Sequence, residues 1–133
     1  MAQSYTLKTK YGKIKVSRSA IARAVVDSLD DMRGKVSMSS NRGKLLREGS
    51  AAELNAVDVE AFEGDIRIRV NVIVRFGVSI TETADAIAAS VQKALRRILG
   101  RGPSLVTIRV RGVISQKNIA PRNITIRREL EVQ

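Results

Sequence analysis

The chain contains no His, no Cys and no Trp among its 133 residues, and only 3% of the residues are aromatic. Without His and Cys it lacks the usual zinc ligands, a thiol nucleophile and an imidazole base. The absence of Cys also excludes a disulfide-held secreted scaffold. We therefore expect no cofactor and no metal site.

Long apolar runs are missing as well. The N-terminal segment MAQSYTLKTKYGKIK is basic but has no apolar core, so it does not have the pattern of a signal peptide. No apolar run approaches the roughly 18 residues that span a bilayer. Apolar residues still make up 44% of the chain, which argues against disorder. These features predict a soluble, intracellular, single-domain protein.

Positive charge is in excess. The chain has 24 Lys and Arg against 13 Asp and Glu, for a formal net charge of +11. Residues 1–63 carry 11 basic and 8 acidic groups, whereas residues 64–133 carry 13 and 5. Most of the excess therefore belongs to the second half, and its position on the fold decides what it can contact.

Two segments have the period of amphipathic helices. Ser17 or Ser19 supplies the N-cap of the first, and Gly34 its stop. Ser79 and Glu82 have the spacing of a capping box at the start of the second. The apolar stripe of the first helix contains Ile21, Val25, Leu29 and Met32. The stripe of the second contains Ala84, Ile87, Val91, Leu95 and Ile98.

Other segments alternate apolar and polar residues, which is typical of half-buried strands. A hairpin that turns at residues 63–64 places Asp58 opposite Arg69 and Glu60 opposite Arg67. Strands are predicted at residues 13–16, 36–38, 57–61, 66–76 and 106–111, with Phe76 on the core side.

The order strand, helix, strand, strand, helix, strand predicts an α+β open-faced sandwich. Because each strand has one polar face, both helices should cover one face of a mostly antiparallel sheet, with a ferredoxin-like βαββαβ order. We assign the domain to residues 12–114, with a basic N-terminal arm at 1–11 and a C-terminal extension at 115–133. Residues 39–52 are expected to form a mobile loop.

Alternation resumes in the C-terminal extension after Pro121. A strand outside the domain needs a sheet edge, which its own sheet, the N-terminal arm or another subunit can supply. The candidate self-association arm consists of Ile124, Ile126, Leu130 and Val132.

One set of basic residues should project from the sheet face away from the helices. The simpler interpretation is a solvated face, partly neutralised by Asp58 and Glu60. The functional interpretation is a docking face for a partner protein, anionic lipid headgroups or nucleic acid. The face lacks aromatic residues for base stacking, which does not favour nucleic acid. The predicted docking residues are Arg67, Arg69, Arg75, Arg109 and Arg111.

Paired carboxylates are the remaining route to acid–base catalysis. Asp30 and Asp31 are neighbours on a helix and diverge in direction, whereas Asp58 and Glu60 face arginines. No pair is placed for catalysis, so the sequence predicts that the protein is not an enzyme.

Three stretches together resemble a known family. They are GKIKVS at 12–17, DIRIRV followed by VRFGVSI at 65–80, and VTIRVRGV at 106–113. Over roughly residues 12–114 the chain resembles the alkaline-shock-protein family of bacterial envelope stress response proteins. The most specific piece is the strand that ends in aromatic-Gly-Val-x-Ile.

The resemblance implies a small non-enzymatic protein, often held at the cell membrane by a membrane-anchored partner and prone to form homo-oligomers. It carries over no catalytic residue. We therefore predict a cytoplasmic scaffold or interaction protein, peripheral at the inner face of the membrane. It is expected to self-associate and to dock an acidic partner or the membrane periphery through the Arg-rich sheet face. The alternative is a nucleic-acid-binding module that acts through phosphate contacts.

Overall fold

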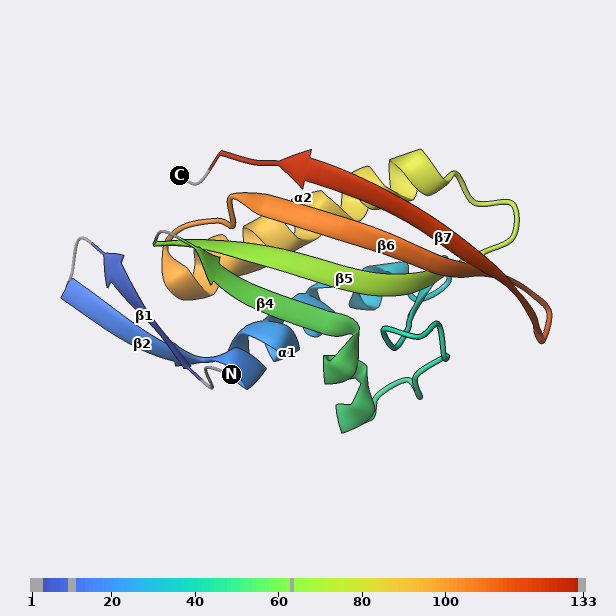
Figure 1. Ribbon diagram of the computed structural model, residues 1–133, viewed down its shortest axis with the longest axis horizontal. Coiled ribbons are helices and arrows are strands. Elements are labelled where there is room, and N and C mark those ends of the chain that lie inside the picture. The colour runs from blue at the N-terminus through green and yellow to red at the C-terminus, as the bar shows by residue number, and fades with distance from the viewer. Residues whose placement is uncertain (1–3, 10–11, 63, 132–133) are drawn as a thin grey trace.

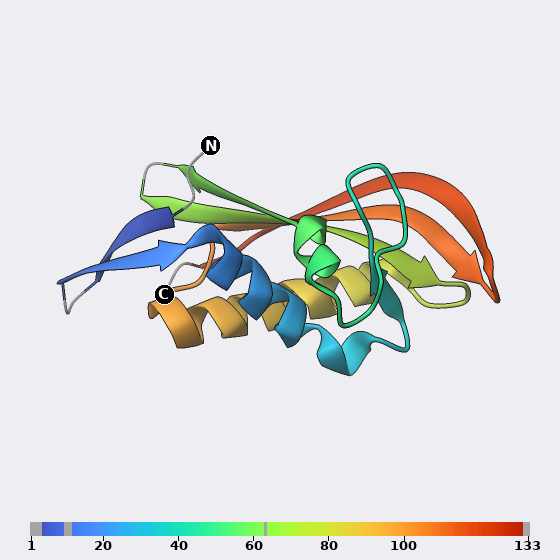
Figure 2. The same cartoon turned by 90° about the horizontal axis from the view of Figure 1, so that it is seen from below.

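A computed structural model describes residues 4–9, 12–62 and 64–131. A twisted sheet forms one layer, and the helices α1 (Arg18–Ser28) and α2 (Ile80–Leu99) lie side by side against one of its faces (Figures 1 and 2). This arrangement confirms the α+β class and the prediction that both helices cover the same face.

The main sheet has five strands, four of which form hydrogen-bonded neighbours in the order β3-β5-β6-β7. The strands β4 and β3 pair one after the other along the same edge of β5, both antiparallel. The strand β6 pairs parallel with the other edge of β5, and β7 pairs antiparallel with β6. The sheet is thus mostly antiparallel. Its strands are β3 (Val36–Met38), β4 (Val57–Phe62), β5 (Asp65–Arg75), β6 (Leu105–Ser115) and β7 (Asn118–Glu129).

The ferredoxin-like order is not confirmed. In that order the strand before the first helix lies between the two strands that flank the second helix. Here the strands that flank α2 are β5 and β6, and they pair directly with each other, so no strand lies between them. The strand before α1 is β2 (Gly12–Ser17), which pairs with β1 (Ser4–Thr9) in a separate two-stranded ribbon. The ribbon projects from the body at the start of α1 (Figures 1 and 2).

The C-terminal extension lies in the chain's own sheet as β7, next to β6. Ile124, Ile126 and Leu130 are partly buried against the core of the same chain, and Val132 lies outside the described residues. The interruption by Pro121 suits this place, because an outer strand tolerates the missing N–H.

The starts of both helices match the local signals of the sequence, but the predicted stop of the first helix at Gly34 is wrong. The helix α1 ends at Ser28 with Leu29 as its C-cap, and a 3-10 turn follows before Gly34. Ser17 and Ser79 each accept a hydrogen bond from a backbone N–H in the first turn of their helix, at 3.1 and 3.3 Å. Gly100 ends α2 in the left-handed conformation with φ of 77°, which glycine adopts without steric cost. Two short 3-10 helices, η1 (Asp30–Met32) and η2 (Ala51–Ala56), precede β3 and β4.

Two apolar residues assigned to the core are exposed instead. Ile98 is 42% exposed, and Leu99 takes its place in the core. Phe76 is 72% exposed because β5 ends at Arg75, so Phe76 belongs to the turn before α2. Periodicity alone does not show where a strand stops.

We expect deletion of residues 117–133 to destabilise the fold, because it removes β7 and uncovers one edge of β6. Losing three half-buried apolar side chains should cost on the order of 3 kcal/mol. Thermal unfolding followed by circular dichroism should show a melting temperature lower by about 10 °C or more. Deletion of residues 1–11 is the matched control, since it removes only the ribbon strand β1. An unchanged melting temperature after the C-terminal deletion would contradict the prediction.

Candidate functional site

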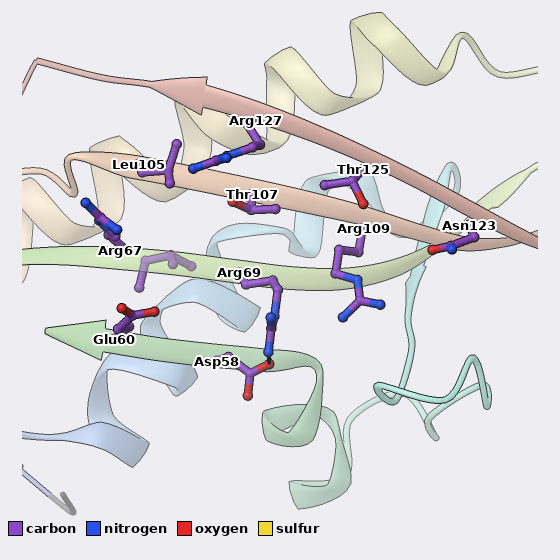
Figure 3. Close-up of a pocket in the computed structure, with 11 residues that line it drawn as sticks. Asp58, Glu60, Arg67, Arg69, Leu105, Thr107, Arg109, Asn123, Thr125 and Arg127 are labelled. Carbon is purple, nitrogen blue, oxygen red and sulfur yellow. Dashed lines mark hydrogen bonds and ion pairs between the residues drawn. The ribbon is translucent and has the colours of Figure 1, made fainter. Parts of the chain in front are cut away.

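The face of the sheet opposite the helices carries an open groove of about 560 Å³ over β4, β5, β6 and β7 (Figure 3). Four arginines line it, two from β5 and one each from β6 and β7, and two carboxylates from β4 form one wall. We call it the arginine groove. Its lining residues are Asp58, Glu60, Arg67, Ile68, Arg69, Leu105, Thr107, Arg109, Asn123, Thr125 and Arg127.

The arginines share this face because of the two-residue period of the strands. Ile68 and Val70 of β5 are buried on the helix side, so the residues between them face away. The register places Arg69 beside Thr107 on β6, and Thr107 beside Arg127 on β7. Arg109 lies two residues after Thr107 on β6 and therefore on the same face. Three guanidinium-bearing residues therefore surround Thr107.

The β4 side of the groove is neutralised within the protein. The predicted hairpin register is confirmed, with Asp58 opposite Arg69 and Glu60 opposite Arg67. Arg69 donates two hydrogen bonds to Oδ2 of Asp58, at 3.0 and 2.7 Å (Figure 3). The charge of Arg69 is thus matched inside the hairpin.

The β6 and β7 side is not neutralised in this way. Arg109 donates a hydrogen bond of 3.0 Å to Oδ1 of Asn41, a neutral acceptor. Burial, followed by the positive charges of Arg111 and Arg69, lowers the pKa of Arg109. In the part of the chain that the structure describes, neither Arg109 nor Arg127 forms an ion pair with a carboxylate. Cations held near like charges without a counterion favour the binding of an anion.

The groove does not include Arg75 and Arg111. Arg75 is the last residue of β5 and is exposed beyond the groove. Arg111 falls where the register of β6 with β7 shifts between Val110 and Gly112, so simple alternation does not describe its direction. Its guanidinium donates to Oδ1 of Asn123 at 3.2 Å, beside the groove.

Sequence reasoning missed the contribution of β7 to the groove. Asn123, Thr125 and Arg127 alternate with Ile124 and Ile126, and this signal places the three polar residues on one face of a strand. The pattern does not indicate which sheet edge the strand joins. Only the pairing of β7 with β6 brings these side chains into the groove.

The segment between β3 and η2 reaches one end of the groove. It passes the edge of the sheet toward the open face (Figure 2). Asn41 accepts the hydrogen bond from Arg109, and Gly43 lies against the backbone and Cβ of Arg111. A turn in which the N–H of Ser40 donates to the carbonyl of Lys44 at 2.8 Å shapes this segment.

A buried ion pair holds the other end of this segment. Glu53 of η2 is 1% exposed and accepts hydrogen bonds from Arg33 at 2.7 and 3.0 Å. It also accepts one from the backbone N–H of Gly49 at 3.0 Å. The hydrogen bond from Arg33 lowers the pKa of Glu53, so this carboxylate stays ionised although it is buried.

Metal binding and membrane crossing have no visible basis in the described residues. No three acidic side chains there are grouped so that they could hold a metal ion. No helix among these residues has both the length and the apolar character needed to cross a bilayer. The groove itself offers guanidinium, hydroxyl and amide donors, which are groups that bind anions.

Comparisons with known proteins confirm the resemblance. The family model that describes the alkaline shock protein 23 family, with a cell envelope-related function, matches residues 6–115 of this sequence. The chain is 29% identical over 116 residues to the uncharacterized protein YloU of Bacillus subtilis strain 168, covering 83% of this chain and 95% of YloU. No solved structure matches it. The family match contains Arg67, Arg69 and Arg109 but ends before Arg127.

We expect Glu53→Gln to destabilise the fold by about 3 kcal/mol at neutral pH, because it breaks a buried ion pair. The folded-state pKa of Glu53 lies below its ordinary value of 4.5, so the stabilisation is present above that value and is lost as the pH falls below it. Urea unfolding between pH 7 and pH 3 should therefore show the wild type and the variant converging in acid. Glu48→Gln is the control, since Glu48 approaches the same Arg33 only at 3.8 Å and its side chain is 72% exposed. A difference that stays constant over the whole pH range would refute this assignment.

Proposed function

The chain belongs to the alkaline shock protein 23 family, and we propose that it is a non-enzymatic interaction protein that binds an acidic protein segment in the arginine groove. The cell envelope-related function of the family provides the setting. The observation that carries the proposal is the pair Arg109 and Arg127, which line the groove without a carboxylate partner among the described residues.

The donors of the groove suit carboxylate groups. A guanidinium group forms two parallel hydrogen bonds with a carboxylate, and such pairs are stronger than neutral hydrogen bonds. Arg69 and Arg127 lie two strands apart, which is about 10 Å across a sheet. This separation leaves room between them for an extended segment whose acidic side chains reach Arg127 and Arg109. The hydroxyl groups of Thr107 and Thr125 supply neutral donors between the charges.

Nucleic acid is the alternative ligand, because guanidinium groups also bind phosphates. No aromatic side chain lines the groove, so exposed bases would find no stacking partner there. The charges of Asp58 and Arg69 already match each other on the β4 side, so that side offers no free cation of this pair to a continuous polyanion that crosses the whole groove. A short acidic segment over β6 and β7 avoids both difficulties.

We expect Arg109→Ala and Arg127→Ala each to weaken binding of an Asp- and Glu-rich peptide by about tenfold, the size of one charge-assisted hydrogen bond. The measurement is fluorescence anisotropy of a labelled peptide at about 50 mM and about 200 mM salt, where charge-driven binding weakens as salt rises. Arg97→Ala on the helix side is the matched control. Equal binding by all three variants would overturn the proposal.

The same titration with single-stranded and duplex DNA separates the two ligand classes. Weaker binding of DNA than of the peptide supports the acidic protein segment. Tighter binding of DNA, with a steep salt dependence and loss in Arg109→Ala, would replace it with the nucleic-acid function.

We also propose that the protein self-associates, and we place the contact at the β1–β2 ribbon. The predicted arm residues of β7 are partly buried in their own chain, and Pro121 and Arg122 on this outer strand are residues that discourage further pairing. A two-stranded ribbon is marginally stable alone, so a strand from a second copy would stabilise it.

Light scattering tests this placement. The full chain should have a mass above that of a monomer, and deletion of residues 1–11 should give a smaller, folded species. If the full chain is a monomer, or if the deletion leaves the mass unchanged, the placement is wrong.

A further inference from the structure

Phe76 is the most exposed large apolar side chain that the structure describes, at 72%, against 42% for Ile98 and 40% for Leu45. It lies in the turn between β5 and α2, next to Gly77 with its φ of 91°. The backbone N–H of Phe76 donates to the carbonyl of Ile114 at 2.8 Å, which ties the turn to the end of β6. The turn thus holds the aromatic ring outside the core.

Three cations belong to the chain segments that meet at this end of the sheet. Arg75 precedes Phe76, and its backbone N–H donates to the carbonyl of Lys35 at 2.8 Å. Lys117 lies in the turn between β6 and β7, close after Ile114. All three cations are exposed, and none forms an ion pair within the described residues. We call Lys35, Arg75, Phe76 and Lys117 the Phe76 end.

The Phe76 end lies apart from the other features of the molecule. The β5–α2 turn and the β6–β7 turn lie at one end of the body, and the β1–β2 ribbon lies at the opposite end (Figures 1 and 2). None of the four residues lines the arginine groove. The carboxylate nearest to Phe76 in sequence is Glu82, in the first turn of α2, where the helix dipole favours a negative charge.

We propose that the Phe76 end binds the surface of a bilayer that contains anionic lipids. Phe is one of the apolar residues that interfacial segments bury at the boundary of headgroups and acyl chains, and Phe76 would insert at that depth. Basic side chains close to a bilayer surface are attracted to anionic headgroups. In this proposal Lys35, Arg75 and Lys117 are the side chains that contact the headgroups. A single apolar anchor, with cations that are unpaired within the described residues at the same end of the molecule, fits a charged interface better than it fits a purely apolar surface.

The absence of Trp from the chain allows a direct test. Phe76→Trp introduces a single indole reporter at the proposed contact. With vesicles of phosphatidylglycerol and phosphatidylcholine we expect its emission to shift to the blue and to be quenched by lipids brominated on the acyl chains. Ile98→Trp, at the C-terminal end of α2, is the matched control and should show neither effect. Vesicles of phosphatidylcholine alone should leave both reporters unchanged.

A second set of variants separates this surface from the arginine groove. Arg75→Glu in the Phe76→Trp background should lower binding in vesicle sedimentation by about tenfold or more, because it reverses one of three charges. Arg109→Ala should leave vesicle binding unchanged. Thermal unfolding of each variant checks that the fold is intact.

The outcomes decide between the alternatives. A blue shift in the Phe76→Trp variant alone, lost when Arg75→Glu is added, supports the proposal. No shift on anionic vesicles, or equal shifts in both reporter variants, overturns it. If Arg109→Ala abolishes vesicle binding and the emission of the Phe76→Trp reporter does not shift on vesicles, the headgroups bind in the arginine groove and the proposal is wrong. Abolition of vesicle binding by soluble glycerol phosphate at low concentration would show a phosphate site rather than a membrane contact.

Discussion

The two-residue period of β5 and β6 is the constraint on which the rest of the structure depends. One side of this parallel pair carries Val70 and Ile108, which are buried under α1 and α2. Their neighbours along each strand, Arg69 on β5 and Arg109 on β6, must therefore face away from the helices. A shift of one residue would bury Arg69 and Arg109 and expose the core. The packing that stabilises the fold therefore also fixes the direction of the arginines, and the groove needs no stabilisation of its own.

The strands at the two sides make the groove asymmetric. On one side β4 supplies Asp58, which neutralises Arg69 at 2.7 Å. On the other side β7 adds Arg127 to the face, while the neighbouring Arg128 pairs with Asp85 of α2 at 2.7 Å. One of these two arginines thus contacts a helix on the other face of the sheet, and the other lines the groove. The uncompensated charge lies over β6 and β7, away from the carboxylates.

Much of the fold follows from local patterns, while the choice of neighbours does not. The caps at Ser17 and Ser79 and the cross-strand pair of Asp58 with Arg69 are all visible in the sequence, because they depend on residues close along the chain. Alternation shows that β2 and β7 need a neighbour but not which one. For that reason the ribbon, the position of β7 and the contribution of Arg127 could not be predicted. The bulge that redirects Arg111 has only the neighbouring Gly112 as a local signal, because an isolated glycine within a strand pattern indicates a bulge or a close approach of the backbone.

The segment between β3 and η2 supplies the hydrogen-bond acceptor of Arg109. It brings Asn41 to Arg109, where the amide oxygen accepts a hydrogen bond and orients the guanidinium. An Asp at this position would hold the same geometry but would cancel the charge. A neutral acceptor leaves the positive charge of Arg109 unmatched, although burial and its arginine neighbours already lower its pKa. A site that needed only structural stability would favour the carboxylate. The amide suits a site in which Arg109 receives its counterion from outside the chain.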